Sequence, residues 1–202
     1  TYLHWAFNEP MEKQETEHFC PSNPQEWRAW LETNHVQKDS VWLIIHKKKS
    51  ACPNLSWSEA VDHALCFGWI DSIKKTIDSE KYKQYFGKRK AKSNWSRINK
   101  EKVVYLTEQN LMTKAGLQSI TIAKTNGSWS ILDHIEALII PEDLAVALEE
   151  REGSNAYFEG LSKSAKKILL HWVVSAKRPE TREKRIKEII ELCSKNIKAR
   201  GG

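Results

Sequence analysis

The stretch SWSEAVDHALCFGWIDSIKKTIDSEKYKQYF, residues 56–86, predicts the fold of the first half of the chain. Ser56 and Glu59 match a capping box, in which the two residues satisfy backbone N–H groups at a helix start. Apolar residues then recur at helical spacing up to Gly68, which can end the helix in the left-handed conformation. Two β-rich runs flank residues 78–80, and this pattern predicts a hairpin. A helix followed by a hairpin therefore forms the centre of the first half.

Elements on both sides extend this pattern. Upstream, Asn23 and Pro24 indicate a helix start. The first residues of VWLIIHKKK (41–49) are apolar at both odd and even positions, as in a central strand that is covered on both faces. Downstream of Phe86 the signals are helical, over 99–110, 113–126, a short helix after Pro141, one capped by Ser154, 163–176, and a last helix opened by Pro179. The sequence therefore predicts an α+β fold. A small N-terminal α/β half with a short, mostly antiparallel sheet precedes an all-helical C-terminal half.

The length of 202 residues allows one domain of good size or two small ones. We expect a leader or disordered start over residues 1–16, and an α/β domain with its following helices over 17–126. A linker is expected over 127–141 and a helical C-terminal domain over 142–202. Met11 can serve as a native start, so the fold prediction leaves residues 1–10 aside.

The composition excludes several classes of protein. An apolar content of 40% with 29% charged residues is typical of an ordered globular chain. No run approaches the roughly 18 apolar residues of a membrane helix, and the acidic start does not match a signal peptide. The four cysteines show no C-x-x-C and no regular spacing, which favours reduced thiols over a zinc site. We therefore expect a cytoplasmic protein without a metal or another cofactor.

The net charge of +6 is segregated along the chain. Residues 1–80 carry a net −4, residues 81–102 a net +8, residues 103–162 a net −6 and residues 163–202 a net +8. Two basic blocks are thus separated by an acidic one. Such blocks indicate an anionic partner more specifically than the average charge does.

The helix SEAVDHALCFGWID, residues 58–71, carries one cluster of reactive side chains. His63 and Cys66 are three residues apart, so they can meet on one helix face as a Cys–His pair for nucleophilic catalysis. Asp71 follows at the helix-to-strand junction, where it can act as a general base or hold a nearby lysine. The structural alternatives are a packed cysteine beside a surface histidine, and an Asx turn at Asp71.

The segment GKRKAKSNWSRINKEK, residues 87–102, is strongly basic. Ser96 matches the N-cap of a helix whose first N–H groups can hold an anion. Trp95 is expected at the mouth of such a site, where its ring can stack on a base. The alternative is a solvated loop whose tryptophan is buried. The residues that carry the binding hypothesis here are Arg89, Trp95, Ser96, Asn99 and Lys100.

A third segment, SAKRPETREKR, covers residues 175–185. Arg178, Arg182 and Arg185 recur on one helical stripe, and their guanidinium groups suit carboxylate or phosphate. Arginine near a helix start is disfavoured by the helix dipole, and this local conflict indicates a role. The alternative is surface ion pairing, with Lys177 compensating a helix C-terminus.

Specific strings run through the chain in a fixed order: ALCFGWIDS (64–72), KSNWSRINKEKV (92–103) and LSKSAKKILLHWVVSAKRPETREKRI (161–186). With VWLIIHKKKS, EAVDHAL and LMTKAGL, they resemble the YdeI-like or OmpD-associated family, also called the bacteriocin-protection family, from about residue 17 to 195. The family carries proline where this chain has Lys88 and Lys114, so the turn before Arg89 is looser here. The resemblance implies a cytoplasmic bacterial protein with an α/β front half and a helical tail. It implies protection against bacteriocins or cationic peptides and supplies no catalytic residue.

We favour a non-enzymatic stress-protection protein that binds an anionic ligand, bearing phosphate or carboxylate, in a basic and aromatic cleft. Here Trp69 and Asp71 join the residues of the 87–102 segment, and Lys177, Arg178 and Arg182 close the cleft. A second hypothesis is a hydrolase or transferase that uses Asp71 with His63 and Cys66. A third is nucleic-acid binding through the 81–102 block. The sequence also leaves open whether the chain binds a protein partner.

Overall fold

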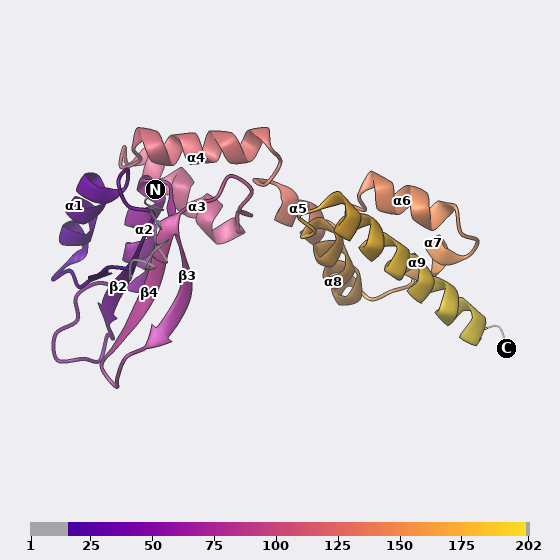
Figure 1. Cartoon of the computed structure of the whole chain (residues 1–202), viewed down its shortest axis with the longest axis horizontal. Helices are drawn as coiled ribbons and strands as arrows, with labels where there is room; N and C mark the ends of the chain where they lie inside the picture. The colour runs from indigo at the N-terminus through magenta and orange to yellow at the C-terminus, as the bar shows by residue number, and fades with distance from the viewer. Residues whose placement is uncertain (1–15, 201–202) are drawn as a thin grey trace, which may run out of the picture. The chain divides into compact units, whose positions relative to one another are not determined.

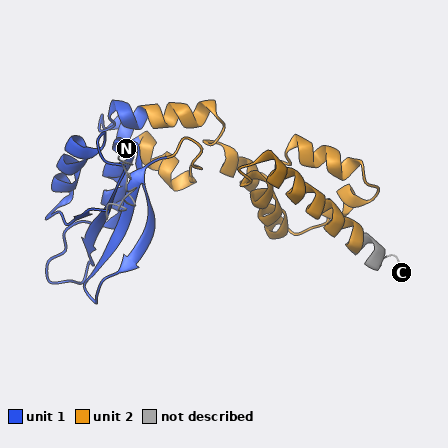
Figure 2. Ribbon diagram, viewed as in Figure 1, with its two compact units in different colours: residues 1–89, 105–117 blue, residues 90–104, 118–202 orange. Residues whose placement is uncertain are grey.

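The computed structural model describes residues 16–200, with side chains up to residue 195. The chain forms two compact units (Figure 2). Within the described part, unit 1 comprises residues 16–89 and 105–117, and unit 2 comprises residues 90–104 and 118–200. Except for Thr16, the expected leader lies outside the described residues. The expected α+β class is confirmed, with a sheet in unit 1 and helices after it (Figure 1).

Unit 1 contains a four-stranded sheet in the order β1-β2-β4-β3. The strands are β1 (His18–Phe19), β2 (Ser40–His46), β3 (Trp69–Thr76) and β4 (Lys81–Lys88). β1 runs parallel to β2, whereas β2 and β3 both pair antiparallel with β4. The register of β3 against β4 shifts between Asp71 and Lys74. The hairpin expected around residues 78–80 is therefore confirmed as β3–β4, and β2 is an inner strand as expected.

One face of this sheet is the core of unit 1. β2 and β4 bury alternate residues, which are Val41, Leu43 and Ile45 on one strand and Tyr82, Gln84 and Phe86 on the other. Helices α1 (Pro24–Asn34) and α2 (Trp57–Cys66) contribute fully buried Trp27, Leu31, Val61 and Leu65. The ring of Trp27 lies 5.4 Å from that of Phe86 between centroids. Burial of such large apolar side chains is the main stabilising contribution in this unit.

The local signals around α2 act as the sequence predicts. The Ser56 hydroxyl accepts from the Glu59 N–H at 3.2 Å, and the Ser56 N–H donates to the Glu59 carboxylate at 2.8 Å. Gly68 has φ of 73°, the left-handed conformation that glycine adopts without a Cβ clash. The chain then turns directly into β3.

Helices α3 (Arg97–Glu108) and α4 (Lys114–Thr125) each have one end in unit 1 and the other in unit 2. Thr113 holds the start of α4 on the end of α2, because its N–H and its hydroxyl both donate to the Cys66 carbonyl, at 3.0 and 2.6 Å. A Cβ at Gly116 would lie 2.3 Å from that carbonyl oxygen. Only glycine permits this close approach.

Unit 2 is helical. Besides its parts of α3 and α4 it contains α5 (Ile131–Glu136), α6 (Glu142–Glu149), α7 (Ser154–Glu159), α8 (Lys163–Val174) and α9 (Pro179–Arg200). Its core includes Ile135, Leu144, Leu148, Phe158, Leu170, Val173, Ile186, Ile189 and Cys193.

Two details of unit 2 differ from expectation. Residues 131–136 of the expected linker form α5, whose Ile135 is buried because it packs against the helices that follow. Gly153, with φ of 77°, precedes α7 as its N-cap, so Ser154 is the first helical residue rather than the cap. No helix in the described ranges is long and apolar enough to cross a bilayer.

Candidate functional site

Asp71 and Arg89 belong to a polar cluster in unit 1. The Asp71 carboxylate accepts from Trp57 Nε1 at 2.9 Å and from Gln84 Nε2 at 3.5 Å, and Gln84 is only 3% exposed. Burial lowers the pKa of Arg89 to about 10, while the charge of Asp71 acts in the opposite direction. The guanidinium thus stays charged at neutral pH, and Asp71 is its counter-charge.

The two tryptophans of the predicted cleft are core residues. Trp69 is fully buried and meets Trp30 edge to face, with 5.9 Å between centroids. Trp95 is 1% exposed and packs 5.0 Å from the ring of Trp129. The expected position of Trp95 at the mouth of a cleft is not observed, because its ring contributes more to stability when buried than when exposed.

The start of α3 forms as predicted, but Lys100 near this start already takes part in an ion pair. Ser96 Oγ accepts from the Asn99 N–H at 3.3 Å, which satisfies one of the free donors of the first turn. The Lys100 ammonium pairs with the Asp133 carboxylate and lies 5.4 Å from the ring centre of Trp129. Lys100 therefore already has an anionic partner within unit 2.

The arginine stripe of the tail has a structural role. Arg182 holds Asp143 with two hydrogen bonds and donates to the Val173 carbonyl at 3.4 Å. Arg185 donates to the Trp172 carbonyl at 2.6 Å and lies over the Trp172 ring. These side chains reach back from the start of α9 to the C-terminal carbonyl groups of α8, which explains why arginine is tolerated at a helix start.

Lys177 and Arg178 occupy the α8–α9 corner and are exposed. Trp69, Asp71 and Arg89 lie in unit 1, whereas Trp95, Ser96, Asn99, Lys100, Lys177, Arg178 and Arg182 lie in unit 2. A single site that combines the two basic blocks stays a prediction.

The nucleophile of the enzyme hypothesis is inaccessible in this structure. Cys66 is fully buried, and burial raises the pKa of its thiol. His63 lies on the same helix, and burial, followed by the charge of Arg28, lowers its pKa. Asp71 is hydrogen-bonded to Trp57 and Gln84. The arrangement offers no exposed thiol for nucleophilic chemistry on α2.

A cationic and aromatic patch that was not predicted from the sequence lies on the other face of the sheet. We call it the sheet-face patch and define it as His18, Trp42, Lys75, Lys83 and Tyr85. Trp42 pairs across the strands with Tyr85, ring to ring at 5.0 Å. The ammonium groups of Lys83 and Lys75 lie 4.8 and 5.3 Å from the Trp42 ring centre, and His18 stacks at 6.4 Å.

No acidic residue occupies the outward positions of the two inner strands. These positions are Ser40, Trp42, Ile44 and His46 on β2 and Lys81, Lys83, Tyr85 and Gly87 on β4. Trp42, Lys83 and Tyr85 are half-buried, whereas Lys75 and His18 are exposed. The alternation of lysine and aromatic residues in KYKQYF was the signal that could have revealed this surface.

Two grooves in unit 2 are less suited to an anion. One, of about 1060 Å³, is lined by Ile98, Leu132 and Ile168, with both acidic and basic side chains around them. The other, of about 730 Å³, includes Arg182 together with Glu150, Glu183 and Glu191. No group of three or more His, Cys, Asp and Glu side chains between residues 16 and 195 could hold a metal ion.

Comparison with known families divides the chain in two. Residues 19–119 match a model described as "Domain of unknown function (DUF8412)". Residues 137–196 match a model described as "Bacteriocin-protection, YdeI or OmpD-Associated". The resemblance to the bacteriocin-protection family is thus confirmed for the tail, but the first half matches a different model. No curated protein and no solved structure matches the chain.

Proposed function

We propose that the sheet of this chain, which belongs to the family of the domain of unknown function DUF8412 through the match over β2 to β4, binds an anionic ligand. The ligand class is a planar ring that bears phosphate, as in nucleotides and single-stranded nucleic acids. The proposal keeps the anionic ligand expected from the sequence and moves its site to the sheet-face patch.

The observation that supports it is the placement of two lysines and a histidine around the exposed part of Trp42. Aromatic rings stack on bases at about 1–3 kcal/mol per base, and lysines neutralise the phosphates. The ammonium groups now interact with the ring faces. On binding, these flexible side chains move to the phosphates while the base takes their place.

Fluorescence anisotropy with a labelled single strand of about ten nucleotides tests this proposal. We expect binding that weakens steeply with salt, and a loss of about tenfold or more for Trp42→Ala. Lys83→Gln should reduce the slope of log affinity against log salt by about 1, whereas Lys163→Gln at the exposed start of α8 should not. Competition by mononucleotides and by inorganic polyphosphate distinguishes a free nucleotide, a strand and phosphate alone.

Either of two results would overturn the proposal. One is the absence of binding to any of these probes at low salt. The other is equal binding by Trp42→Ala, Lys83→Gln and the wild type, which would place binding on a different surface. Circular dichroism of each variant establishes that the sheet is intact.

A protective role and a cytoplasmic location complete the proposal. The description of the model that matches residues 137–196 supports the first. The free thiols of Cys20, Cys52, Cys66 and Cys193 support the second, since reducing compartments keep cysteines unpaired. Expression of the protein in a bacteriocin-sensitive strain should raise the fraction of cells that survive bacteriocin treatment, and Trp42→Ala should remove this increase. Equal survival with and without the protein argues against the protective role alone.

A further inference from the structure

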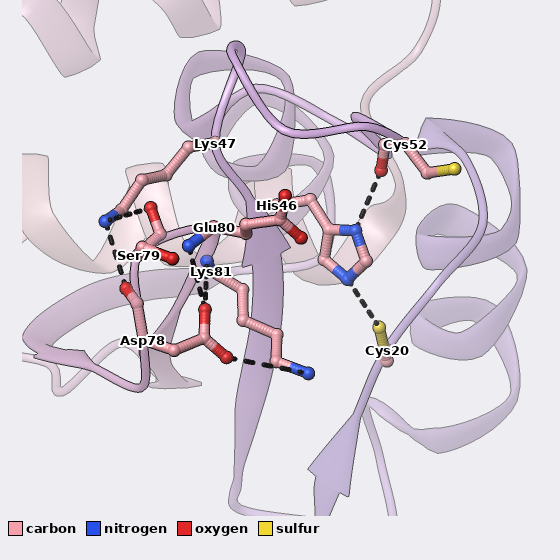
Figure 3. A network of polar contacts seen from close by, with 8 residues as sticks. All are labelled: Cys20, His46, Lys47, Cys52, Asp78, Ser79, Glu80 and Lys81. Carbon is pink, nitrogen blue, oxygen red and sulfur yellow. Dashed lines mark hydrogen bonds and ion pairs between the residues drawn. The ribbon is translucent and has the colours of Figure 1, made fainter.

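Cys20 and His46 form a thiol–imidazole pair at one end of the sheet (Figure 3). Cys20 directly follows β1, and His46 is the last residue of β2. The Cys20 Sγ lies 3.8 Å from the His46 Nε2, within hydrogen-bond reach for sulfur. Cys20 is an exposed residue, and His46 is half-buried. The pair is independent of the ligand proposed above.

A third group fixes the tautomer of the imidazole. His46 Nδ1 lies 2.8 Å from the carbonyl oxygen of Cys52. Because a carbonyl oxygen can only accept a hydrogen bond, Nδ1 must carry the proton. In the neutral ring Nε2 is then the unprotonated nitrogen, and it is the nitrogen that faces the thiol. A nucleophile, a base and a group that orients the base are therefore connected by consecutive hydrogen bonds.

The surroundings keep this thiol protonated until the base acts. Partial burial raises the pKa of Cys20; the charge of Lys81 opposes this effect and that of Glu26 adds to it. Lys81 lies opposite His46 in the β2–β4 register. The hairpin turn beside it is fixed, since the Lys47 ammonium donates to the carbonyls of Asp78 and Ser79 (Figure 3). A thiol that stays protonated needs a neighbouring base to react at neutral pH.

We propose that Cys20 is a site of covalent modification by soft carbon electrophiles, with His46 as its general base. With an α,β-unsaturated carbonyl compound the sulfur bonds to the β-carbon while the carbon–carbon π bond breaks. His46 Nε2 takes the thiol proton, which is then delivered to the α-carbon, so no further reactant is consumed.

The other cysteines provide internal references. Cys52 is exposed, but its sulfur points away from the imidazole (Figure 3). Cys66 and Cys193 are buried. Differences in rate between Cys20 and Cys52 therefore report the effect of the histidine rather than that of exposure alone.

The test uses the full chain with a limiting amount of N-ethylmaleimide, and peptide mass spectrometry to follow each cysteine separately. Cys20 should react about tenfold faster than Cys52, a modest effect for a positioned base. His46→Gln should reduce the Cys20 rate to that of Cys52 while changing the Cys52 rate by less than about twofold. Cys52→Ser, which keeps the backbone carbonyl, should leave the Cys20 rate unchanged.

A Cys20 rate that is unchanged in His46→Gln, or no faster than that of Cys52, would overturn the proposal. Should His46→Gln not fold, the wild type alone gives the answer through its pH profile. The ratio of the Cys20 rate to the Cys52 rate should fall at acidic pH, because general-base assistance is lost there. A ratio that is constant from neutral to acidic pH removes His46 as the base.

Discussion

Arg182 Nε and Nη2 donate to the two carboxylate oxygens of Asp143 at 2.6 and 2.8 Å, and this fork joins the start of α9 to the start of α6. The same guanidinium donates to a carbonyl at the end of α8. One side chain thus connects three helices of unit 2.

The first prediction concerns this arginine. Arg182→Ala should lower the free energy of unfolding of unit 2 by about 1–2 kcal/mol, because the pair is partly exposed but bidentate. A double-mutant cycle with Asp143→Ala in urea unfolding measures the coupling. Additive effects of the two substitutions would contradict a direct role of the pair.

The same pair predicts a pH dependence. The hydrogen bond from Arg182 holds the pKa of Asp143 below its ordinary value. Since the folded-state pKa is the lower one, the stabilisation is complete above the ordinary value and is lost as the pH falls through the folded value. The stability difference between wild type and Arg182→Ala should therefore shrink in acid below about pH 3.9. Urea unfolding over a series of acidic pH values measures it, and a constant difference argues against the pair.

The second prediction concerns Asp71 and Arg89. Asp71→Asn keeps the shape of the acceptor for Trp57 but removes the negative charge near the buried guanidinium. We expect a loss of about 1–3 kcal/mol in the free energy of unfolding. Trp57→Phe is the control, since it removes the indole donor and part of the ring but keeps the charge of Asp71, and it should cost less. Equal losses for both variants would mean that the charge is unimportant.

The third prediction concerns Gly116, which lies against the end of α2. An added Cβ would meet the backbone of Cys66 at 2.3 Å, so Gly116→Ala should destabilise by about 1–3 kcal/mol despite the higher helix propensity of alanine. In Gly160→Ala the nearest atoms lie at 3.4 Å, and no comparable loss is expected. Thermal unfolding of the two variants compares the sites. Similar melting temperatures would contradict the close approach at Gly116.

The fourth prediction is a pH dependence set by His63. Burial lowers the pKa of His63 in the folded protein, so the unfolded chain takes up a proton first as the pH falls. Stability should therefore decrease as the pH falls through the ordinary histidine range near 6.5. His63→Gln should make stability less dependent on pH between about 7.5 and about 5.5. Urea unfolding tests this, with His134→Gln at an exposed position as the control.

Local signals predicted most of the fold. The capping box at Ser56, the left-handed Gly68 and the β3–β4 hairpin each depend on residues a few positions apart, and all three form as expected. The α5 helix was missed because its six residues carry weak periodicity, and packing of Ile135 against distant helices decides its structure.

Contacts between distant residues explain what the sequence could not predict about the sites. Arg182 and Asp143 are 39 residues apart, and Cys20 and His46 are 26 apart, so no spacing rule joins them. Trp42 was placed on a central strand, but the alternation alone did not indicate that it faces outward beside Lys83 and Tyr85. Trp95 belonged to a basic string, yet its position is set by Trp129, which lies 34 residues further along.

The shifted register of β3 has a consequence for how the molecule behaves when concentrated. β3 is an outer strand of the described sheet, and such strands present backbone groups to which another chain can add. The irregularity between Asp71 and Lys74 lies in the pairing of β3 with β4 and bends β3, and Lys74 and Lys75 add two like charges to that strand. A second copy approaching edge to edge would meet a bent strand and like-charge repulsion. We therefore expect Lys75, a residue of the sheet-face patch, also to disfavour edge-to-edge association of two copies.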